Sequence, residues 1–314
     1  YRSGAITIGT AYLIVHYTNL LRRPIREITQ QLENLQNIGA ATERIADLRG
    51  VTGKIEDGAC VSIPAGPLAV DFEAVSFCYH DEELVLKEIA FHLDPGRVLG
   101  LLGRTGSGKT TLARLVFRLY DLSAGRILLG GADIRAAKLD HLRRRVALVT
   151  QDVQLFQASV RDNLTFFDST LSDERLLAVI EELGLADWFG ALPDGLDTRL
   201  ATGGRSLSAG EAQLLAMARV FLRDPGLVIL DEASSRLDPA TEQLIERAVD
   251  RLLEGRTAIV IAHRLGTVRR ADDILILEEG RALEHGLRRQ LAADSGSHYY
   301  LSLIHISEPT RLRR

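Results

Sequence analysis

Cysteine is scarce in this sequence of 314 residues, and its scarcity excludes several kinds of protein. Only Cys60 and Cys78 are present, so the chain has no disulfide framework. This cysteine usage is typical of a cytosolic compartment. The Cys and His residues also lack the spacing of a metal site, so the sequence predicts no metal centre built from these residue types.

A strong charge of either sign is missing as well. The chain has 38 Lys and Arg against 42 Asp and Glu, which gives a formal net charge of −4, and the arginine clusters at 143–145, 269–270 and 288–289 are short. We therefore predict that the chain binds no nucleic acid. The length accommodates two domains, and a hydrophobic content of 46% is enough for a sizeable core.

The first residues are poor in charge. Gly4 to Leu21 contains no formally charged residue over 18 positions, the lower limit for a membrane-spanning helix. Arg22 and Arg23 follow directly, as is typical of the cytoplasmic end of such a helix. A buried core helix or a signal peptide could share this composition, but a signal peptide needs a small-residue cleavage site that we do not find. Because residue 1 is Tyr rather than Met, we expect the gene product to start upstream.

Three segments with other compositions surround the main part of the chain. From Pro24 to Arg49, apolar residues recur on one face of an amphipathic helix. Residues 50–67 are rich in Gly and Pro and predict a linker. Residues 301–314 resemble the translation of an adapter used in making sequencing libraries, so we expect the genuine protein to stop near Tyr300.

A glycine-rich loop carries the clearest chemical signal. Val98 to Leu102 is an apolar run typical of a buried parallel strand, and Thr110 to Tyr120 has helical apolar spacing. Between them lies the pattern G-x-x-x-x-G-K-T, which holds nucleotide phosphates with backbone N–H groups and a helix N-terminus. We expect Lys109 to reach the β- and γ-phosphates and the Thr110 hydroxyl to bind Mg²⁺. An ordinary glycine-rich turn is the alternative. The predicted nucleotide-binding residues are Gly103, Arg104, Thr105, Gly106, Ser107, Gly108, Lys109, Thr110 and Thr111.

Two other apolar runs end in residues that suit the same chemistry. Leu227 to Leu230 precedes Asp231 and Glu232, and Thr257 to Ala262 precedes His263. Ligands bind at the carboxyl ends of strands in open α/β sheets, so we expect these side chains beside the phosphates. Asp231 would hold Mg²⁺, Glu232 would polarise the attacking water, and His263 would sense the γ-phosphate. A lone His is more often structural, but its place at a strand end favours the functional interpretation.

A fourth motif, Leu207-Ser208-Ala209-Gly210-Glu211, stands before another helix. Ser208 with Glu211 three residues later is a capping box, so we expect Ser208 to cap the helix from Ala209 to Leu222. The backbone N–H of Gly210 could also approach a γ-phosphate at this helix end. Both roles use the same exposed helix end, so they are compatible.

Together these motifs resemble the ATP-binding cassette (ABC) family, specifically the exporters that carry membrane and nucleotide-binding domains on one polypeptide. The resemblance covers about residues 1 to 298. It implies that Tyr79 stacks on adenine and that Gln151 touches Mg²⁺ and couples to the membrane domain. It also implies that Ser235 to Asp238 forms the loop that crosses between two cassettes, and that Ser208 to Glu211 serves the ATP of the opposite copy. The usual signature is Leu-Ser-Gly-Gly-Gln, so Ala209 and Glu211 depart from it mildly.

The resemblance also implies an architecture. We expect an α/β cassette of the P-loop NTPase type, with a mostly parallel core sheet and an antiparallel β piece near residues 69–93. A helical subdomain would run from about Ser159 to Arg223. In domain terms, residues 1–49 would be the end of a transmembrane domain, 50–67 a linker and 68–300 the nucleotide-binding domain.

Three functions compete at this point. The first is an ATPase that uses Mg²⁺ and a second cassette, as a homo- or heterodimer, to drive export across the cell (inner) membrane, with the cassette on the cytoplasmic side. The second is a soluble ABC protein of DNA repair or translation, which would lack Gly4 to Leu21 and would usually show a large insertion or a second cassette. The third is a degenerate half-site that holds ATP without hydrolysing it. The presence of Lys109, Gln151, Glu232 and His263 counts against the third.

Overall fold

The computed structural model describes residues 7–50, 53, 55–58, 61–79, 83–150, 153–200, 207–231, 239–261 and 268–307. The chain divides into two compact units, Tyr1–Glu56 and Asp57–Arg314. The boundary between them falls within residues 50–67, the segment that the sequence predicts as a linker.

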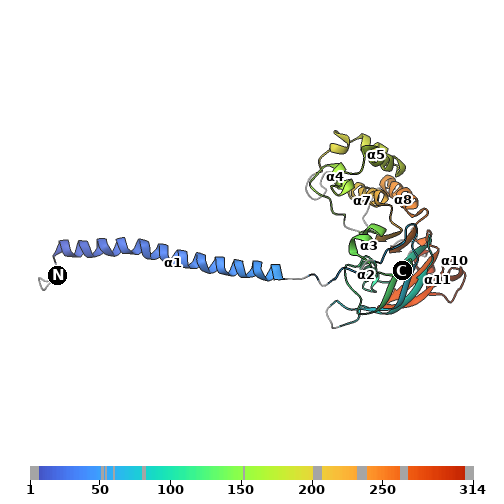
Figure 1. Cartoon of the computed structure of the whole chain (residues 1–314), viewed down its shortest axis with the longest axis horizontal. Coiled ribbons are helices and arrows are strands. Elements are labelled where there is room, and N and C mark those ends of the chain that lie inside the picture. Colours follow the sequence, from blue (N-terminus) through green and yellow to red (C-terminus); the bar gives the residue numbers. More distant parts are fainter. Residues whose placement is uncertain are drawn as a thin grey trace, which may run out of the picture. The chain divides into compact units, whose positions relative to one another are not determined.

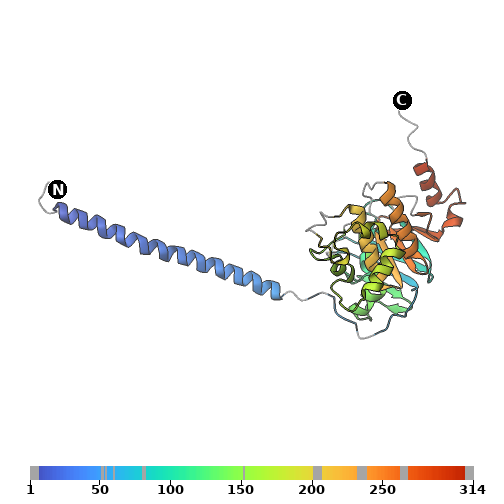
Figure 2. The same ribbon diagram turned by 90° about the horizontal axis from the view of Figure 1, so that it is seen from above.

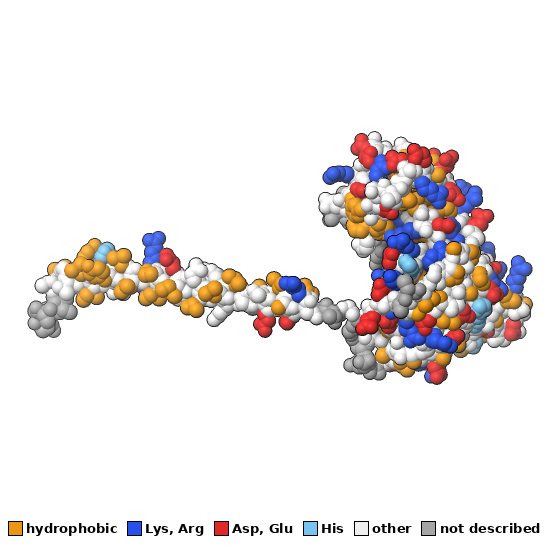
Figure 3. Space-filling view, viewed as in Figure 1, with side chains coloured by type: hydrophobic (Ala, Val, Ile, Leu, Met, Phe, Trp, Pro, Cys, Tyr) orange, Lys and Arg blue, Asp and Glu red, His pale blue; other side chains and the backbone are white. Residues whose placement is uncertain are grey.

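The first unit is built on one long helix, α1 (Ile8–Gly50). It includes the helical stretch predicted from Pro24 to Arg49, and it runs through this proline without a break. Proline removes only one backbone donor, and the helical spacing of apolar residues continues on both sides of it. Hydrophobic side chains occur along the whole length of α1 (Figure 3). Among the helices in the described part of the chain, none combines the length and hydrophobicity that crossing a membrane requires.

The second unit contains a six-stranded sheet in the order β10-β9-β3-β8-β7-β6. Every neighbouring pair is parallel except β9 and β10, which are antiparallel. Strand β8 is buried along its whole length, and β3, β7 and β9 are buried except at their last residue, as expected for a parallel sheet covered on both faces. The mostly parallel core sheet predicted from the sequence is confirmed. The strands are β3 (Val98–Leu102), β6 (Val146–Val149), β7 (Leu227–Asp231), β8 (Thr257–Ile261), β9 (Asp273–Glu278) and β10 (Arg281–Leu287).

A second sheet is antiparallel throughout, with the order β2-β1-β4-β5. Its first two strands are the antiparallel piece predicted near residues 69–93, which is confirmed. The other two strands were not predicted. The strands are β1 (Val70–Phe77), β2 (Leu86–Leu93), β4 (Ala124–Leu129) and β5 (Ala132–Asp133).

Several helices from the middle and later parts of the sequence lie together beside the strands. Helices α4, α5, α7 and α8 lie together on one side of the strands in Figure 1, and they lie in front of the strands in Figure 2. The predicted helical subdomain from about Ser159 to Arg223 is thus confirmed in its helical character. The helices are α2 (Lys109–Val116), α3 (Leu139–Arg145), α4 (Val160–Thr165), α5 (Asp173–Glu182), α6 (Ala186–Gly190), a 3₁₀ turn η1 (Gly195–Asp197), α7 (Ala209–Arg223), α8 (Pro239–Leu253), α10 (Arg288–Leu291) and α11 (His298–Ser307).

Two hydrophobic cores hold this unit together. One joins the two sheets and α2, and it includes Phe72, Leu99 and Leu112. The other joins the opposite face of the six-stranded sheet to α5, α7 and α8, and it includes Val228 and Leu252. Burial of this apolar surface on both faces fixes the carboxyl ends of the parallel strands in one place.

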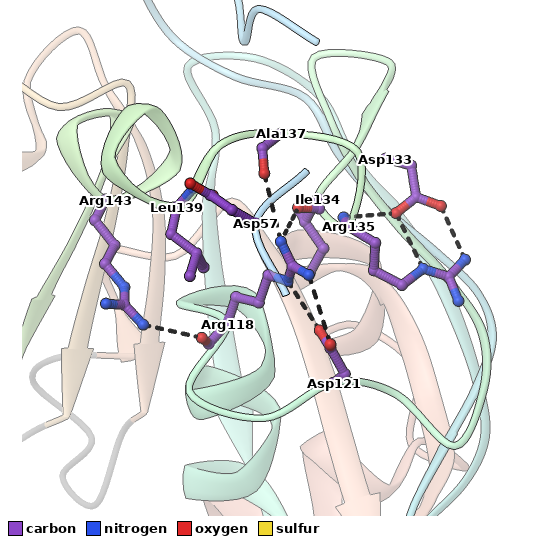
Figure 4. A network of polar contacts seen from close by, with 9 residues as sticks. All are labelled: Asp57, Arg118, Asp121, Asp133, Ile134, Arg135, Ala137, Leu139 and Arg143. Carbon is purple, nitrogen blue, oxygen red and sulfur yellow. Dashed lines mark hydrogen bonds and ion pairs between the residues drawn. The ribbon is translucent and has the colours of Figure 1, made fainter. Parts of the chain in front are cut away.

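The C-terminal end of α2 is held by a buried arginine (Figure 4). The Arg118 side chain is only 3% exposed, and its Nε donates to Asp121 Oδ1 at 2.8 Å. Its Nη1 reaches the backbone oxygens of Ile134 and Ala137, both at 3.4 Å. Arg143 of α3 donates in turn to the Arg118 carbonyl oxygen at 3.2 Å. These contacts tie the helix that follows the phosphate loop to α3.

Residues 57, 58 and 61–67 lie against the same α3 region. The Asp57 carboxylate accepts a hydrogen bond from the first backbone N–H of α3 at 2.7 Å (Figure 4). Arg145, at the end of α3, donates to the carbonyl oxygens of Pro64 (3.0 Å) and Gly66 (2.7 Å). The second half of the predicted linker is therefore attached to the second unit by hydrogen bonds.

Candidate functional site

Two of the sequence motifs, the phosphate loop and Asp231, lie at the edge of the six-stranded sheet where the parallel strands end. Strands β6, β7, β8 and β3 are parallel neighbours, so their carboxyl ends lie side by side. The phosphate loop follows β3, and Asp231 ends β7 opposite Ile261 of β8. The positions that follow β6, β7 and β8 in sequence include Gln151, Glu232 and His263. These three residues lie outside the described part of the chain, as do Ser235 and Asp238.

The loop after β3 requires glycine at two positions. Gly103 has φ +145°, and a Cβ atom there would lie 2.3 Å from the Leu277 carbonyl oxygen. Gly108 has φ +103°, and a Cβ atom there would lie 2.6 Å from Leu86 Cδ2. Both the backbone conformation and the close neighbours exclude a side chain at these positions.

Lys109 is buried in the loop that precedes it, with a relative exposure of 5%. Its Nζ donates to the carbonyl oxygens of Gly103 (2.6 Å) and Arg104 (2.9 Å). Burial lowers the pKa of Lys109 below the usual lysine value, and the nearby negative charge of Asp231 opposes that shift. The structure thus brings together Lys109 and Asp231, which come from two separate motifs.

The start of α2 offers hydrogen-bond donors. Gly108 is its N-cap residue and has no side chain with which to cap the first N–H groups. The Ser107 Oγ is buried and has no hydrogen-bond partner among the described residues. Unpaired donors at a helix N-terminus suit an anion such as a phosphate. Thr110 is exposed at this end of α2, where its hydroxyl is accessible to a metal ion carried with the phosphates.

The donor set around the loop fits Mg²⁺ in character. Mg²⁺ takes oxygen ligands, is commonly held by one or two protein groups together with phosphate oxygens, and keeps several waters. Asp231 offers a carboxylate and Thr110 a hydroxyl. Among the described residues, no group of three or more His, Cys, Asp or Glu side chains could hold a metal ion.

Tyr79 lies beside the same helix. Its hydroxyl is 3.0 Å from Thr111 Oγ1 and 3.4 Å from Arg114 Nη1. Its ring makes edge contacts with the rings of Phe77 and Tyr120. The sequence singles out Tyr79 and Thr111 separately and does not predict that they touch. Arg114 was missed, because an exposed arginine on an amphipathic helix has no distinguishing sequence pattern.

The capping box predicted before α7 is present. Ser208 Oγ accepts from the Glu211 backbone N–H at 3.2 Å, and the Ser208 backbone N–H donates to Glu211 Oε2 at 2.6 Å. Ser208 and Ala209 are exposed and Gly210 is buried. Among the described residues, no hydrogen bond or ion pair joins these four to the phosphate loop of the same chain.

A buried arginine anchors α7 and was not predicted. Arg219 is 7% exposed, and its Nε and Nη2 donate to the Asn163 carbonyl and Oδ1 atoms at 2.6 and 2.9 Å. Its Nη1 donates to the Gln154 carbonyl at 2.8 Å. Burial, with a smaller contribution from nearby Arg223, lowers the pKa of Arg219 to about 10. The helix that begins at Ser208 is thereby joined to the segment that follows β6. An arginine within the otherwise apolar face of this helix is the sequence signal that could have indicated it.

Comparison with known proteins gives consistent results. The family model for the ABC transporter domain matches residues 86–235. The chain is 36% identical over 302 residues to a probable multidrug resistance ABC transporter ATP-binding/permease protein of Bacillus subtilis, covering 95% of the chain and 44% of that protein. It is 37% identical over 312 residues to an ATP-dependent lipid A-core flippase of Pseudomonas fluorescens, covering 98% of the chain and 52% of that protein. The chain thus spans about half the length of these curated relatives.

A solved structure agrees with the sequence matches. It is described as a bacterial Atm1-family ABC exporter with ATP bound, and it superposes with a TM-score of 0.78 at 30% identity. The superposition covers 98% of the chain and 55% of that structure. The phosphate loop, the acid at the end of β7 and the capped helix α7 lie within a fold shared with this exporter. The chain therefore belongs to the ABC transporter family, with the exporter type of organisation.

Proposed function

We propose that this chain is the ATP-hydrolysing part of an ABC exporter and that it couples ATP binding and hydrolysis to transport across a membrane. The observation that carries this proposal is the phosphate loop, in which Gly103, Gly108 and the buried Lys109 form a site that suits a polyphosphate. The relatives named above include an ATP-binding/permease protein, a lipid A-core flippase and an exporter with ATP bound. They favour export over the DNA-repair or translation alternative.

Different residues of the chain bind the phosphates, hold Mg²⁺, activate the attacking water and stack on the base. The N–H groups at the start of α2 and the Lys109 ammonium bind the β- and γ-phosphates. Thr110, Asp231 and Gln151 hold Mg²⁺, which neutralises phosphate charge when it is bound. Glu232 accepts a proton from the attacking water, and His263 contacts the γ-phosphate. Tyr79 stacks on the adenine.

The site is completed by a second cassette. Ser208 and Gly210 lie at the start of α7, and Ser208 is exposed there. A helix N-terminus of this kind can bind the γ-phosphate of an ATP held by another chain. Ser235 to Asp238 forms the loop that crosses between the two copies. The assembly is a homo- or heterodimer at the cell (inner) membrane, with the cassettes on the cytoplasmic side.

Capping and catalysis at Ser208 can be separated with a matched control. Ser159 caps α4 with the same kind of box, in which its Oγ accepts from the Asp162 backbone N–H at 3.0 Å. Ser208→Ala and Ser159→Ala should each cost about 1 kcal/mol of stability, because each loses a helix cap. Only Ser208→Ala should also lower the rate of ATP hydrolysis at saturating ATP. Equal loss of hydrolysis in the two variants would make Ser208 a capping residue alone.

The shared site is tested by mixing two inactive variants. Ser208→Arg should bind ATP without hydrolysing it, and Lys109→Ala should not bind ATP tightly. A mixed dimer joins the intact loop of the first chain to the intact α7 of the second. An equal mixture should therefore regain about a quarter of the wild-type rate, since half of the dimers carry one complete site out of two. A mixture no more active than its separate parts would contradict a site built from two copies.

A further inference from the structure

The hydroxyl of Tyr79 is bound by the helix that begins at the phosphate loop. Tyr79 Oη lies 3.0 Å from Thr111 Oγ1, and Arg114 Nη1 donates to the same Oη at 3.4 Å. Thr111 is 7% exposed, so its hydroxyl has little access to water as an alternative partner. Thr111 and Arg114 are three residues apart on α2 and share one face of the helix. One face of α2 therefore supplies both polar contacts of the Tyr79 hydroxyl.

The ring of Tyr79 is also held. Its centroid lies 4.9 Å from that of Phe77 at an interplanar angle of 83°, and 5.0 Å from that of Tyr120 at 89°. Phe77 is buried at the end of β1, whereas Tyr120 is 39% exposed. Both contacts are edge-to-face, the arrangement that aromatic pairs favour. The ring and the hydroxyl of Tyr79 are thus constrained from different directions.

We propose that Thr111 and Arg114 are positioning residues for base recognition, holding Tyr79 at a set orientation relative to the phosphate loop. The proposal rests on the proposed function, in which Tyr79 stacks on adenine. One helix then binds the phosphates at its first turn and orients the base-stacking ring through the next. Holding the ring before the nucleotide binds removes part of the entropy cost of ordering it on binding.

The hydroxyl can be tested apart from the ring. Tyr79→Phe keeps an aromatic face for stacking and removes only the bond to α2. Thr111→Val removes the partner. In the full chain, each variant should weaken ATP binding about three- to tenfold, because each frees one side chain that the nucleotide must then order. The double variant should be no weaker than Tyr79→Phe alone, because Tyr79→Phe already removes the bond that Thr111→Val removes. If the loss of ATP affinity in the double variant equals the product of the losses in the two single variants, the proposal is overturned.

A ligand without a base provides the second readout. Inorganic tripolyphosphate should bind Tyr79→Phe as it binds the wild type, because it makes no use of the ring. Thr111→Ser keeps the hydroxyl and should restore ATP affinity, which guards against a folding defect in Thr111→Val. Equal loss of ATP and tripolyphosphate affinity in Tyr79→Phe would overturn the positioning role.

Arg114 is tested in the same way. Arg114→Ala should weaken ATP more than tripolyphosphate, and Arg114→Gln should recover part of the loss because its amide can still donate to Tyr79 Oη. If Arg114→Ala weakens both ligands equally, Arg114 attracts phosphate by its charge and does not position the ring.

The ATP affinity of Tyr79→Ala distinguishes a failure of the proposed function from a failure of the positioning role alone. Tyr79→Ala should weaken ATP more than Tyr79→Phe does, because it also removes the stacking ring. If Tyr79→Ala binds ATP like the wild type, the base-stacking role fails and the inference fails with it. If Tyr79→Ala weakens ATP but Tyr79→Phe does not, Tyr79 stacks without help from Thr111, and only the positioning inference is overturned.

Discussion

The Lys109 ammonium donates to the Gly103 carbonyl oxygen at 2.6 Å, so the cation of the phosphate loop is held by the backbone of the loop that it serves. A second bond to the Arg104 carbonyl, at 2.9 Å, closes the loop further. Two neutral carbonyls do not compensate a buried positive charge, and burial accordingly lowers the pKa of Lys109. An incoming polyphosphate would supply the missing negative charge.

The first prediction concerns that charge. Lys109→Ala should abolish tight ATP binding, because the loop loses its buried ammonium. Isothermal titration calorimetry measures the affinity directly. Lys138→Ala, at an exposed lysine before α3, is the matched control and should bind ATP normally. Near-normal affinity in Lys109→Ala would remove the basis for the phosphate-loop assignment.

The second prediction concerns the anchor of α2. Arg118→Ala should lower the free energy of unfolding by about 2 kcal/mol, because it leaves Asp121 and two carbonyl oxygens without their buried donor. Urea denaturation gives this value. Arg144→Ala removes an ion pair with Asp140 in which both side chains are largely exposed, and it should cost less than about 0.5 kcal/mol. Equal losses in the two variants would show that the Arg118 contacts contribute nothing beyond a surface pair.

The third prediction concerns pH. His92 joins two carboxylates, with Nδ1 2.5 Å from Asp71 Oδ1 and Nε2 3.1 Å from Asp94 Oδ1. The hydrogen bond to Asp71, and then that to Asp94, raises the pKa of His92 above its usual value. A raised pKa in the folded state means that the charged His92 stabilises the fold below the unfolded pKa. That stabilisation is lost as the pH rises through the folded pKa.

The corresponding measurement is a difference in melting temperature between the wild type and His92→Gln. The difference should be positive below the usual histidine pKa of about 6.5 and should shrink as the pH rises through the raised pKa of His92 in the folded state. It should also be small, because the His92 side chain is 56% exposed. A difference that grows with pH would reverse the sign and contradict the interpretation.

The parts of the fold that the sequence predicted are those with strong local patterns. Val98–Leu102 and Leu227–Asp231 are apolar runs between turn signals, and both form buried parallel strands. The pairing of Ser208 with Glu211 predicted a capping box, which is present. In each case neighbouring residues alone determine the local structure, so no knowledge of distant contacts was needed.

The parts that were missed depend on contacts between distant residues. Arg118 is buried because carbonyl groups 16 and 19 residues later in the chain accept its hydrogen bonds. Arg219 is buried because Asn163, 56 residues earlier, accepts its hydrogen bonds. The contact between Tyr79 and Thr111 spans 32 residues. The sequence around each of these arginines predicts only an exposed, charged side chain.

We propose that the chain hydrolyses ATP with Glu232 as the base, in a site closed by a second cassette. Glu232 follows Asp231 directly, at the carboxyl end of β7, but lies outside the described residues. Glu232→Gln should keep ATP and Mg²⁺ binding, because Lys109, Thr110 and Asp231 carry those interactions. Hydrolysis should fall by about 10²–10⁴-fold, the usual contribution of a positioned general base.

The most direct measurement is size-exclusion chromatography of Glu232→Gln with ATP and Mg²⁺, made beside a measurement of its ATP affinity and rate of hydrolysis. ATP that is bound and not hydrolysed should hold two cassettes together, so a stable dimer should elute with ATP and disappear with ADP. Unchanged hydrolysis would show that Glu232 is not the base. Loss of ATP binding together with hydrolysis would instead make it a structural or metal-holding acid, and either result would contradict the account.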